Sequence, residues 1–63
     1  MDVAACKKLI KKLNDTANAF KIDSLHAETL ELYEISIRYH EKAKTLRRLA
    51  KEIQCDLDKQ NKD

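Results

Sequence analysis

Apolar and small residues recur near the start of the chain at alternating intervals of three and four positions. The residues that follow this pattern are Val3, Cys6, Ile10, Leu13, Ala17 and Phe20. A heptad repeat of this kind places its side chains along one side of a helix, where they pack lengthwise against another helix. Four lysines, Lys7, Lys8, Lys11 and Lys12, fall on the remaining surface. We therefore predict a helix over residues 3–20.

A second heptad pattern follows, and no Gly or Pro interrupts it. Residues at intervals of seven are Leu25, Leu32, Tyr39, Leu46 and Ile53, and the complementary row holds Ala43, Ala50 and Leu57. Because nothing in this stretch stops a helix, we predict one long helix over residues 24–58, with a frayed tail over residues 59–63. Leu30, Tyr33 and Ile37 add another apolar stripe on its first half.

The connection between the two helices is expected near residues 20–24. Asp23 or Ser24 is a suitable N-cap for the second helix, because a side-chain oxygen there accepts hydrogen bonds from free backbone N–H groups. Glu28, Glu31 and Glu34 would then lie in early turns, near the positive end of the helix dipole. A short connection makes the helices antiparallel neighbours. The sequence thus predicts an all-α, single-domain hairpin with a short first helix and a long second one.

One segment conflicts locally with this interpretation. Residues 35–39 alternate between apolar and polar side chains and are rich in residues that favour strands. A short strand or a kink in the second helix is therefore an open alternative to a continuous helix.

Unequal helices would leave part of the longer one uncovered. In the predicted hairpin Phe20 pairs with Leu25, Leu13 with Leu32, Cys6 with Tyr39 and Val3 with Ala43. The apolar row beyond Ala43 then lacks a partner, and exposing it costs about 25 cal/mol per Å². We expect a homodimer to cover it, and a helix of another protein or a bent second helix are the alternatives. The predicted dimer interface consists of Leu46, Leu49, Ala50, Ile53 and Leu57.

Composition limits the class of protein. The 63 residues allow one small domain, whose core is marginal without a partner, a disulfide or a metal. Apolar residues make up 43% and the net charge is +2, which argues against a disordered chain and against a strong polyelectrolyte. There is no apolar run of about 20 residues to cross a membrane, and the first residues lack a signal-peptide pattern. We expect a cytoplasmic protein with reduced cysteines.

No residues form a recognisable catalytic or cofactor motif. In the predicted hairpin Cys6 and Cys55 lie about 24 Å apart along the helices, too far for a disulfide. His26 and His40 are too widely spaced to share a metal ion on one turn. We therefore expect no enzymatic activity, no metal and no cofactor.

A run of basic residues in the second helix is the one functional signal in the sequence. It contains Arg38, Lys42, Lys44, Arg47, Arg48 and Lys51, with Glu41 as its single acid. Charges of this kind can set the register and orientation of a coiled coil, contact nucleic-acid phosphates, or meet an acidic protein. We keep all three interpretations open.

The hairpin plan is similar to that of the plasmid repressor-of-primer family, RNA-binding dimers of four helices. Those proteins have nearly equal helices, unlike the hairpin expected here. The plan also looks like the small sporulation aspartyl-phosphate phosphatases, but their Ser-Gln-Glu-Leu-Asp signature is replaced by Leu32-Tyr33-Glu34-Ile35-Ser36. As a short helical chain without catalytic motifs, the protein resembles the accessory proteins of temperate phage early regions, which modulate host machinery by binding it.

The sequence therefore favours a small regulatory or adaptor protein that acts by protein–protein contact, as a homodimer with an unidentified protein partner. The alternative is a nucleic-acid-binding dimer that uses residues 38–51. Phosphate binding weakens steeply with salt, whereas apolar helix pairing changes little, so salt separates the two.

Overall fold

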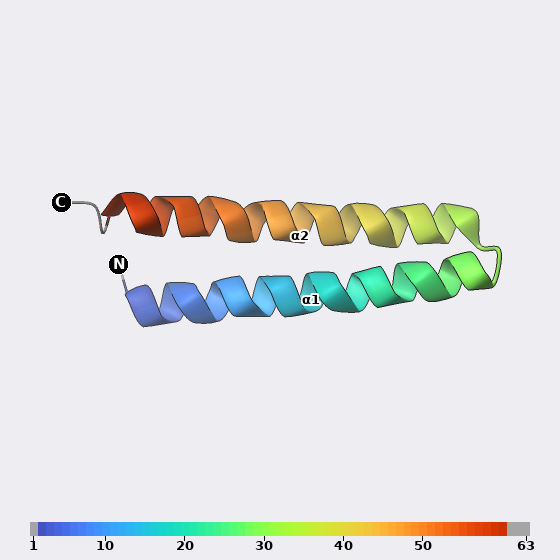
Figure 1. Ribbon diagram of the computed structural model, residues 1–63, viewed down its shortest axis with the longest axis horizontal. Helices are drawn as coiled ribbons and strands as arrows, with labels where there is room; N and C mark the ends of the chain where they lie inside the picture. Colours follow the sequence, from blue (N-terminus) through green and yellow to red (C-terminus); the bar gives the residue numbers. More distant parts are fainter. Residues whose placement is uncertain (1, 61–63) are drawn as a thin grey trace.

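Two helices of nearly equal length form an antiparallel hairpin (Figure 1). The computed structural model describes residues 2–60, in which α1 spans Val3–Thr29 (27 residues) and α2 spans Tyr33–Gln60 (28 residues). The rod measures 50 × 15 × 11 Å. The predicted all-α antiparallel hairpin is confirmed. The prediction of a short first helix and a long second one was wrong, and part of the predicted frayed tail, residues 61–63, lies outside the described residues.

The turn between the helices lies at Leu30–Leu32 instead of residues 20–24. The Leu32 N–H donates to the Ala27 carbonyl (2.8 Å) and the Glu31 N–H donates to the Glu28 carbonyl (3.0 Å). These two bonds define a Schellman motif, which satisfies the free carbonyls at a helix C-terminus. Glu31 occupies its left-handed position, with φ 60°. Glycine usually fills this position, and the chain has none.

Asp2 is the N-cap of α1. The Asp2 carboxylate accepts hydrogen bonds from the N–H groups of Ala4 (3.0 Å) and Ala5 (3.3 Å). Asp23 and Ser24, the N-caps expected for the second helix, lie inside α1 instead. Of the three glutamates expected in early turns of the second helix, only Glu34 lies in the first turn of α2.

Small side chains fill the contact between the helices. The buried residues are Ala17, Ser24, Ala27, Ser36, Ala43, Ala50 and Leu57. Four of the five buried apolar residues are alanines, and only Leu57 is large. Backbones can approach closely over such a seam, but it removes little apolar surface from water. The core of one chain is therefore thin.

A pair of serines fixes which residues lie opposite one another. The Ser24 hydroxyl donates to the Ser36 carbonyl and the Ser36 hydroxyl donates to the Ser24 carbonyl, both at 2.9 Å. Nearby, the rings of Phe20 and Tyr39 stack with centroids 5.9 Å apart. The predicted pairing of Phe20 with Leu25 was therefore wrong, because the turn comes later in the chain than expected.

Residues 35–39 are helical throughout, so the strand alternative was wrong. Their alternation has a different cause. Ser36 is buried in the seam, whereas Ile35 and Ile37 on either side of it are exposed.

Candidate interaction surface

Many large apolar side chains remain exposed on the hairpin. Among the described residues they are Val3, Leu9, Ile22, Leu25, Leu30, Leu32, Tyr33, Ile35, Ile37 and Leu49. Leu30 at the turn is 69% exposed. Isolated apolar side chains on a surface are ordinary, but a contiguous patch marks an interaction site. Their arrangement on the rod therefore matters more than their number.

The seam of each helix has two rows, and they differ in exposure. The first row is buried at Ala17 and Ser24 in α1 and at every seventh residue from Ser36 in α2. Toward the start of α1, Ile10 in the same row is half-buried and Val3 is exposed. The second row, three positions further along each helix, is half-buried apart from the buried Ala27; its half-buried members are Cys6, Leu13, Phe20, Tyr39, Leu46 and Ile53. Positions three residues further along lie about 50° to one side of the first row in a coiled coil. The two helices run antiparallel, so both second rows lean toward the same side of the hairpin.

The positions that flank the second rows extend the same side. Leu9 in α1 and Leu30 at its C-cap flank the second row of α1, and Ile35 and Leu49 flank that of α2. The flanking positions between these apolar residues are polar: Thr16, Asp23, Lys42 and Asp56. Ala27 of α1 lines one shallow depression with Leu30 and with Ile35 and Tyr39 of α2, so the two helices contribute to a common surface. We call this surface the apolar face; it consists of Leu9, Leu13, Phe20, Leu30, Ile35, Tyr39, Leu46, Leu49 and Ile53. It runs along most of the rod.

The opposite side of the hairpin is mainly polar. The Arg47 guanidinium donates a 2.7 Å hydrogen bond across the helices to the Asn18 side chain. Asn14 and Gln54 line a depression on this same side. The half-buried Ile10 also lines this depression. Large exposed apolar residues lie on this side near the turn, where Leu25 is 53% and Ile37 is 57% exposed. The hairpin is thus amphipathic as a whole.

The predicted dimer interface is divided by this arrangement. Ala50 and Leu57 are buried by the chain's own residues, at 3% and 2% exposure. Leu46 and Ile53 are half-buried, and Leu49 is 42% exposed. The reason given for the interface, an uncovered half of the second helix, was wrong because α1 covers α2 along its length. Leu46, Leu49 and Ile53 nevertheless share the apolar face, where Leu9 and Ile35 join them.

The six basic residues of α2 are all exposed, but they surround the helix. Lys42 lies on the side of the apolar face, with its Nζ 5.6 Å from the centre of the Phe20 ring. Arg47 points to the polar side. By helical period Arg38 and Arg48 point away from α1, and Lys44 and Lys51 lie beyond Arg47 on the polar side.

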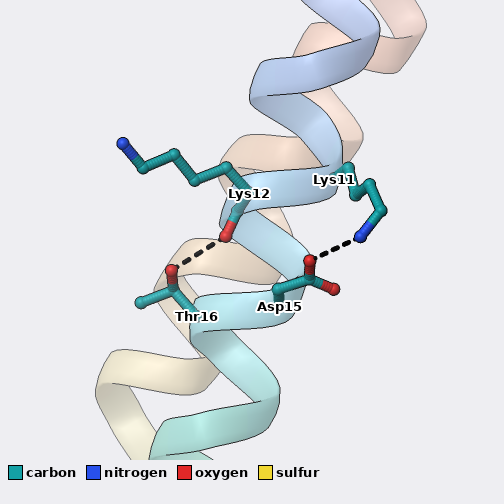
Figure 2. A network of polar contacts seen from close by, with 4 residues as sticks. All are labelled: Lys11, Lys12, Asp15 and Thr16. Atoms are coloured by element: carbon teal, nitrogen blue, oxygen red, sulfur yellow. Dashed lines mark hydrogen bonds and ion pairs between the residues drawn. The ribbon is translucent and has the colours of Figure 1, made fainter.

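The N-terminal lysines do not meet the acidic segment near the turn. Lys11 Nζ forms a 2.8 Å ion pair with Asp15 one turn later in the same helix (Figure 2). The hydrogen bond and the charge of Asp15 raise the pKa of Lys11. Beside this pair the Thr16 hydroxyl donates to the Lys12 carbonyl (Figure 2). The polar contacts of Lys11 and Lys12 shown here therefore stay within α1.

Neither cysteines nor histidines form a site in the described part of the chain. Cys6 and Cys55 are free thiols. The Ser24–Ser36 register brings Cys6 and Cys55 to about the same level of the rod, so the 24 Å separation expected from the sequence was wrong. His26 and His40 are exposed. Within residues 2–60 no group of three His, Cys, Asp or Glu side chains could hold a metal ion.

Neither α1 nor α2 is long and apolar enough to cross a membrane. No family model, curated protein or solved structure matches the chain.

Proposed function

We propose that the protein is a non-enzymatic regulatory or adaptor protein that acts by protein–protein contact, and that it does so as a homodimer. The observation that carries this proposal is the apolar face, where half-buried and exposed apolar side chains from both helices continue along most of the rod. A surface of this kind is costly in water and is covered in most stable proteins.

The exposed area of the chain supports the same proposal. A folded monomer of 7.3 kDa is expected to expose about 4,200 Å². This hairpin exposes 5208 Å², which is roughly 1,000 Å² more than that expectation. A protein–protein interface of standard size buries about 800 Å² on each partner. Association through one face of the rod would therefore bring the exposed area into the ordinary range.

A second candidate function, binding to nucleic acid, is supported by the polar side. Lys44, Arg47 and Lys51 of α2 lie there, and the helical period places Lys7 and Lys11 of α1 on the same side. These five side chains are exposed. A dimer formed through the apolar face would leave them free to contact phosphates.

The experiment that tests the first proposal is sedimentation equilibrium of the whole chain over a range of concentrations. We expect a dimer. Leu9→Glu with Leu49→Glu places two carboxylates in the apolar face without disturbing the seam, because both residues are already exposed. This variant should be monomeric and still helical by circular dichroism. The matched control is Leu25→Glu with Ile37→Glu, which changes residues of similar exposure on the opposite side and should stay dimeric.

Two results would contradict the proposal: a wild-type chain that is monomeric at all concentrations, or control and test variants that dissociate alike. The nucleic-acid candidate is tested by fluorescence anisotropy with labelled double-stranded DNA and RNA at 50 and 200 mM salt, roughly the range over which such contacts weaken steeply. Arg47→Glu with Lys51→Glu should abolish any such binding and leave the dimer intact. Binding that survives this change would exclude the polar side as its site.

A further inference from the structure

We propose that the protein bridges two double-stranded nucleic acids, one on each of two basic surfaces that face in opposite directions from the dimer. This inference rests on the proposed homodimer and on the nucleic-acid candidate, and it adds the class of nucleic acid and the number of sites. It is drawn from the composition of the polar side and from the position of that side relative to the apolar face.

Six basic side chains share the polar side of the hairpin, three from each helix. Asn14 and Arg47 line the depression on that side, and Asn18 accepts the hydrogen bond from Arg47. Residues seven positions apart lie on the same side of a coiled-coil helix, so these contacts place their heptad neighbours as well. We call the set the basic surface; it consists of Lys7, Lys11, Lys21, Lys44, Arg47 and Lys51, all of which are exposed.

Carboxylates are excluded from the middle of the basic surface. The heptad positions that form it hold no Asp or Glu over residues 4–21 of α1 or over residues 37–54 of α2. In the described part of the chain, the carboxylates at these positions are Glu28 near the turn and Asp58 near the end of α2. They bound the basic surface at its two ends. The cations between them therefore form one uninterrupted positive surface.

Two of the six cations have polar contacts with other side chains. Lys11 is paired with Asp15, which lies beside the basic surface on the outer part of α1 (Figure 2). The Arg47 guanidinium donates one hydrogen bond to Asn18, and this contact leaves most of its five N–H donors for a ligand. Of the described residues, none forms an ion pair with the remaining four cations. The positive charge of the basic surface is thus mostly available to an anionic partner.

The ligand that fits this surface is the phosphate backbone of a duplex. From Lys7 to Lys21 the surface extends about 21 Å at 1.5 Å per residue, and DNA carries one phosphate charge per roughly 1.7 Å of its axis. The rod is 15 Å wide, wider than the major groove of about 12 Å, so both helices cannot enter it together. Single strands are bound by stacking on aromatic rings, whereas Phe20 and Tyr39 lie on the apolar face.

Dimerisation through the apolar face places two basic surfaces back to back. Each basic surface lies on the side of its hairpin opposite the apolar face, so the two surfaces point away from each other whichever way the turns are oriented. Two layers of helices separate them, and packed helices lie about 8–10 Å apart. A short duplex is stiff over its whole length and cannot contact both surfaces. One dimer therefore holds two duplexes.

Neutral variants locate the site. The probe is a labelled 12-base-pair duplex, in DNA and RNA forms, followed by fluorescence anisotropy. With six contacts, log affinity should fall against log salt with a slope of about −5. Lys44→Gln with Lys51→Gln should weaken binding at least about tenfold at 50 mM salt and reduce the slope by about two. The matched control, Arg38→Gln with Arg48→Gln, removes the same charge from the part of α2 that points away from α1 and should change affinity far less. Equal losses in the two variants would overturn the assignment of the basic surface.

A capture experiment measures bridging. One duplex is fixed to beads, a second fluorescent duplex is free, and the protein is the only link between them. Wild type should retain the fluorescent duplex. Leu9→Glu with Leu49→Glu, the monomeric variant, should bind a duplex in solution but retain none on the beads. Ala19→Glu with Thr45→Glu is the control of equal charge: it alters exposed residues on the outer parts of the two helices and should still bridge.

The outcomes separate the inference from the proposals beneath it. Retention by wild type and by the control, with none by the monomeric variant, supports bridging by back-to-back surfaces. Binding by a wild-type dimer without retention overturns the bridging but leaves the nucleic-acid candidate and the homodimer standing, and retention by the monomeric variant overturns the back-to-back arrangement. Absence of binding to both duplexes at 50 mM salt overturns the nucleic-acid candidate and this inference together, and leaves the homodimer to sedimentation.

Discussion

Replacement of Glu31 by glycine should stabilise the protein. Glu31 holds a left-handed conformation, φ 60°, between the two hydrogen bonds of the Schellman turn. For a residue with a Cβ this conformation costs about 1–2 kcal/mol. Glycine avoids that cost but loses more backbone conformational entropy on folding, which offsets the gain by about 0.5–1 kcal/mol. The net gain should be roughly 0.5–1 kcal/mol, or a rise in Tm of about 2–8 °C for a chain of this size.

Thermal unfolding followed by circular dichroism at one fixed protein concentration measures this change. Glu41→Gly is the matched control: it removes the same side chain from an exposed site within α2, where glycine should cost about 0.5–1 kcal/mol and lower Tm. Glu31→Gln separates the effect of charge and should leave Tm nearly unchanged. A fall in Tm for Glu31→Gly, similar to that of the control, would refute the left-handed turn and the reasoning drawn from it.

The remaining predictions concern the seam and the surface. Leu57→Ala removes the one large side chain that is fully buried in the described residues and should cost about 2–5 kcal/mol, whereas Leu25→Ala at an exposed site should cost far less; equal losses in urea unfolding would show that Leu57 is not buried. Ala43→Leu overpacks the close contact and should destabilise by about 1–3 kcal/mol; a stabilised variant would mean that the helices lie further apart. Asp15→Asn should lower the pKa of Lys11, seen by NMR titration of its side chain. A raised lysine pKa adds stability below its unfolded value and loses it as pH rises through the folded value, so this variant should be slightly less stable than wild type from pH 5 to 9, and the difference should disappear in strongly alkaline solution.

The heptad pattern predicted the helical hairpin and most of its seam. Ala43, Ala50 and Leu57 are buried in α2, and Leu46 and Ile53 lie beside them in the half-buried row. Periodicity succeeds here because a long helix can bury only one stripe against a single neighbour. The pattern also marked the half-buried row of α1.

The turn could not be located from the sequence for a physical reason. A helix C-terminus is usually recognised by glycine in the left-handed position, and here a glutamate takes that position. Asp23 and Ser24 gave a stronger local signal for a boundary, since both residues favour N-caps. Tertiary packing outweighs this local preference, because Ser24 is buried in the seam, where its hydroxyl donates a hydrogen bond to Ser36. Once the turn moved, every predicted pairing across the helices changed with it.

The candidate surface was predicted only in part. Leu49 is exposed as expected, but Leu9 and Ile35 were not assigned to an interface, although the sequence shows Leu9 beside the first heptad row. The sequence identified apolar residues in excess of what one contact can bury. It could not show which side of the rod they share, because that depends on the register, and the register depends on the turn.

The serine pair has a consequence for the accuracy of folding. Ala43 and Ala50 of α2 are seven residues apart, so sliding one helix by two turns would again bring an alanine of α2 opposite Ala17. The same slide would leave each serine hydroxyl, now facing hydrocarbon, without its acceptor on the other helix, and an unmet buried hydroxyl costs about 1–3 kcal/mol. Ser24 and Ser36 therefore favour the native register of the two helices over a register that is shifted by two turns.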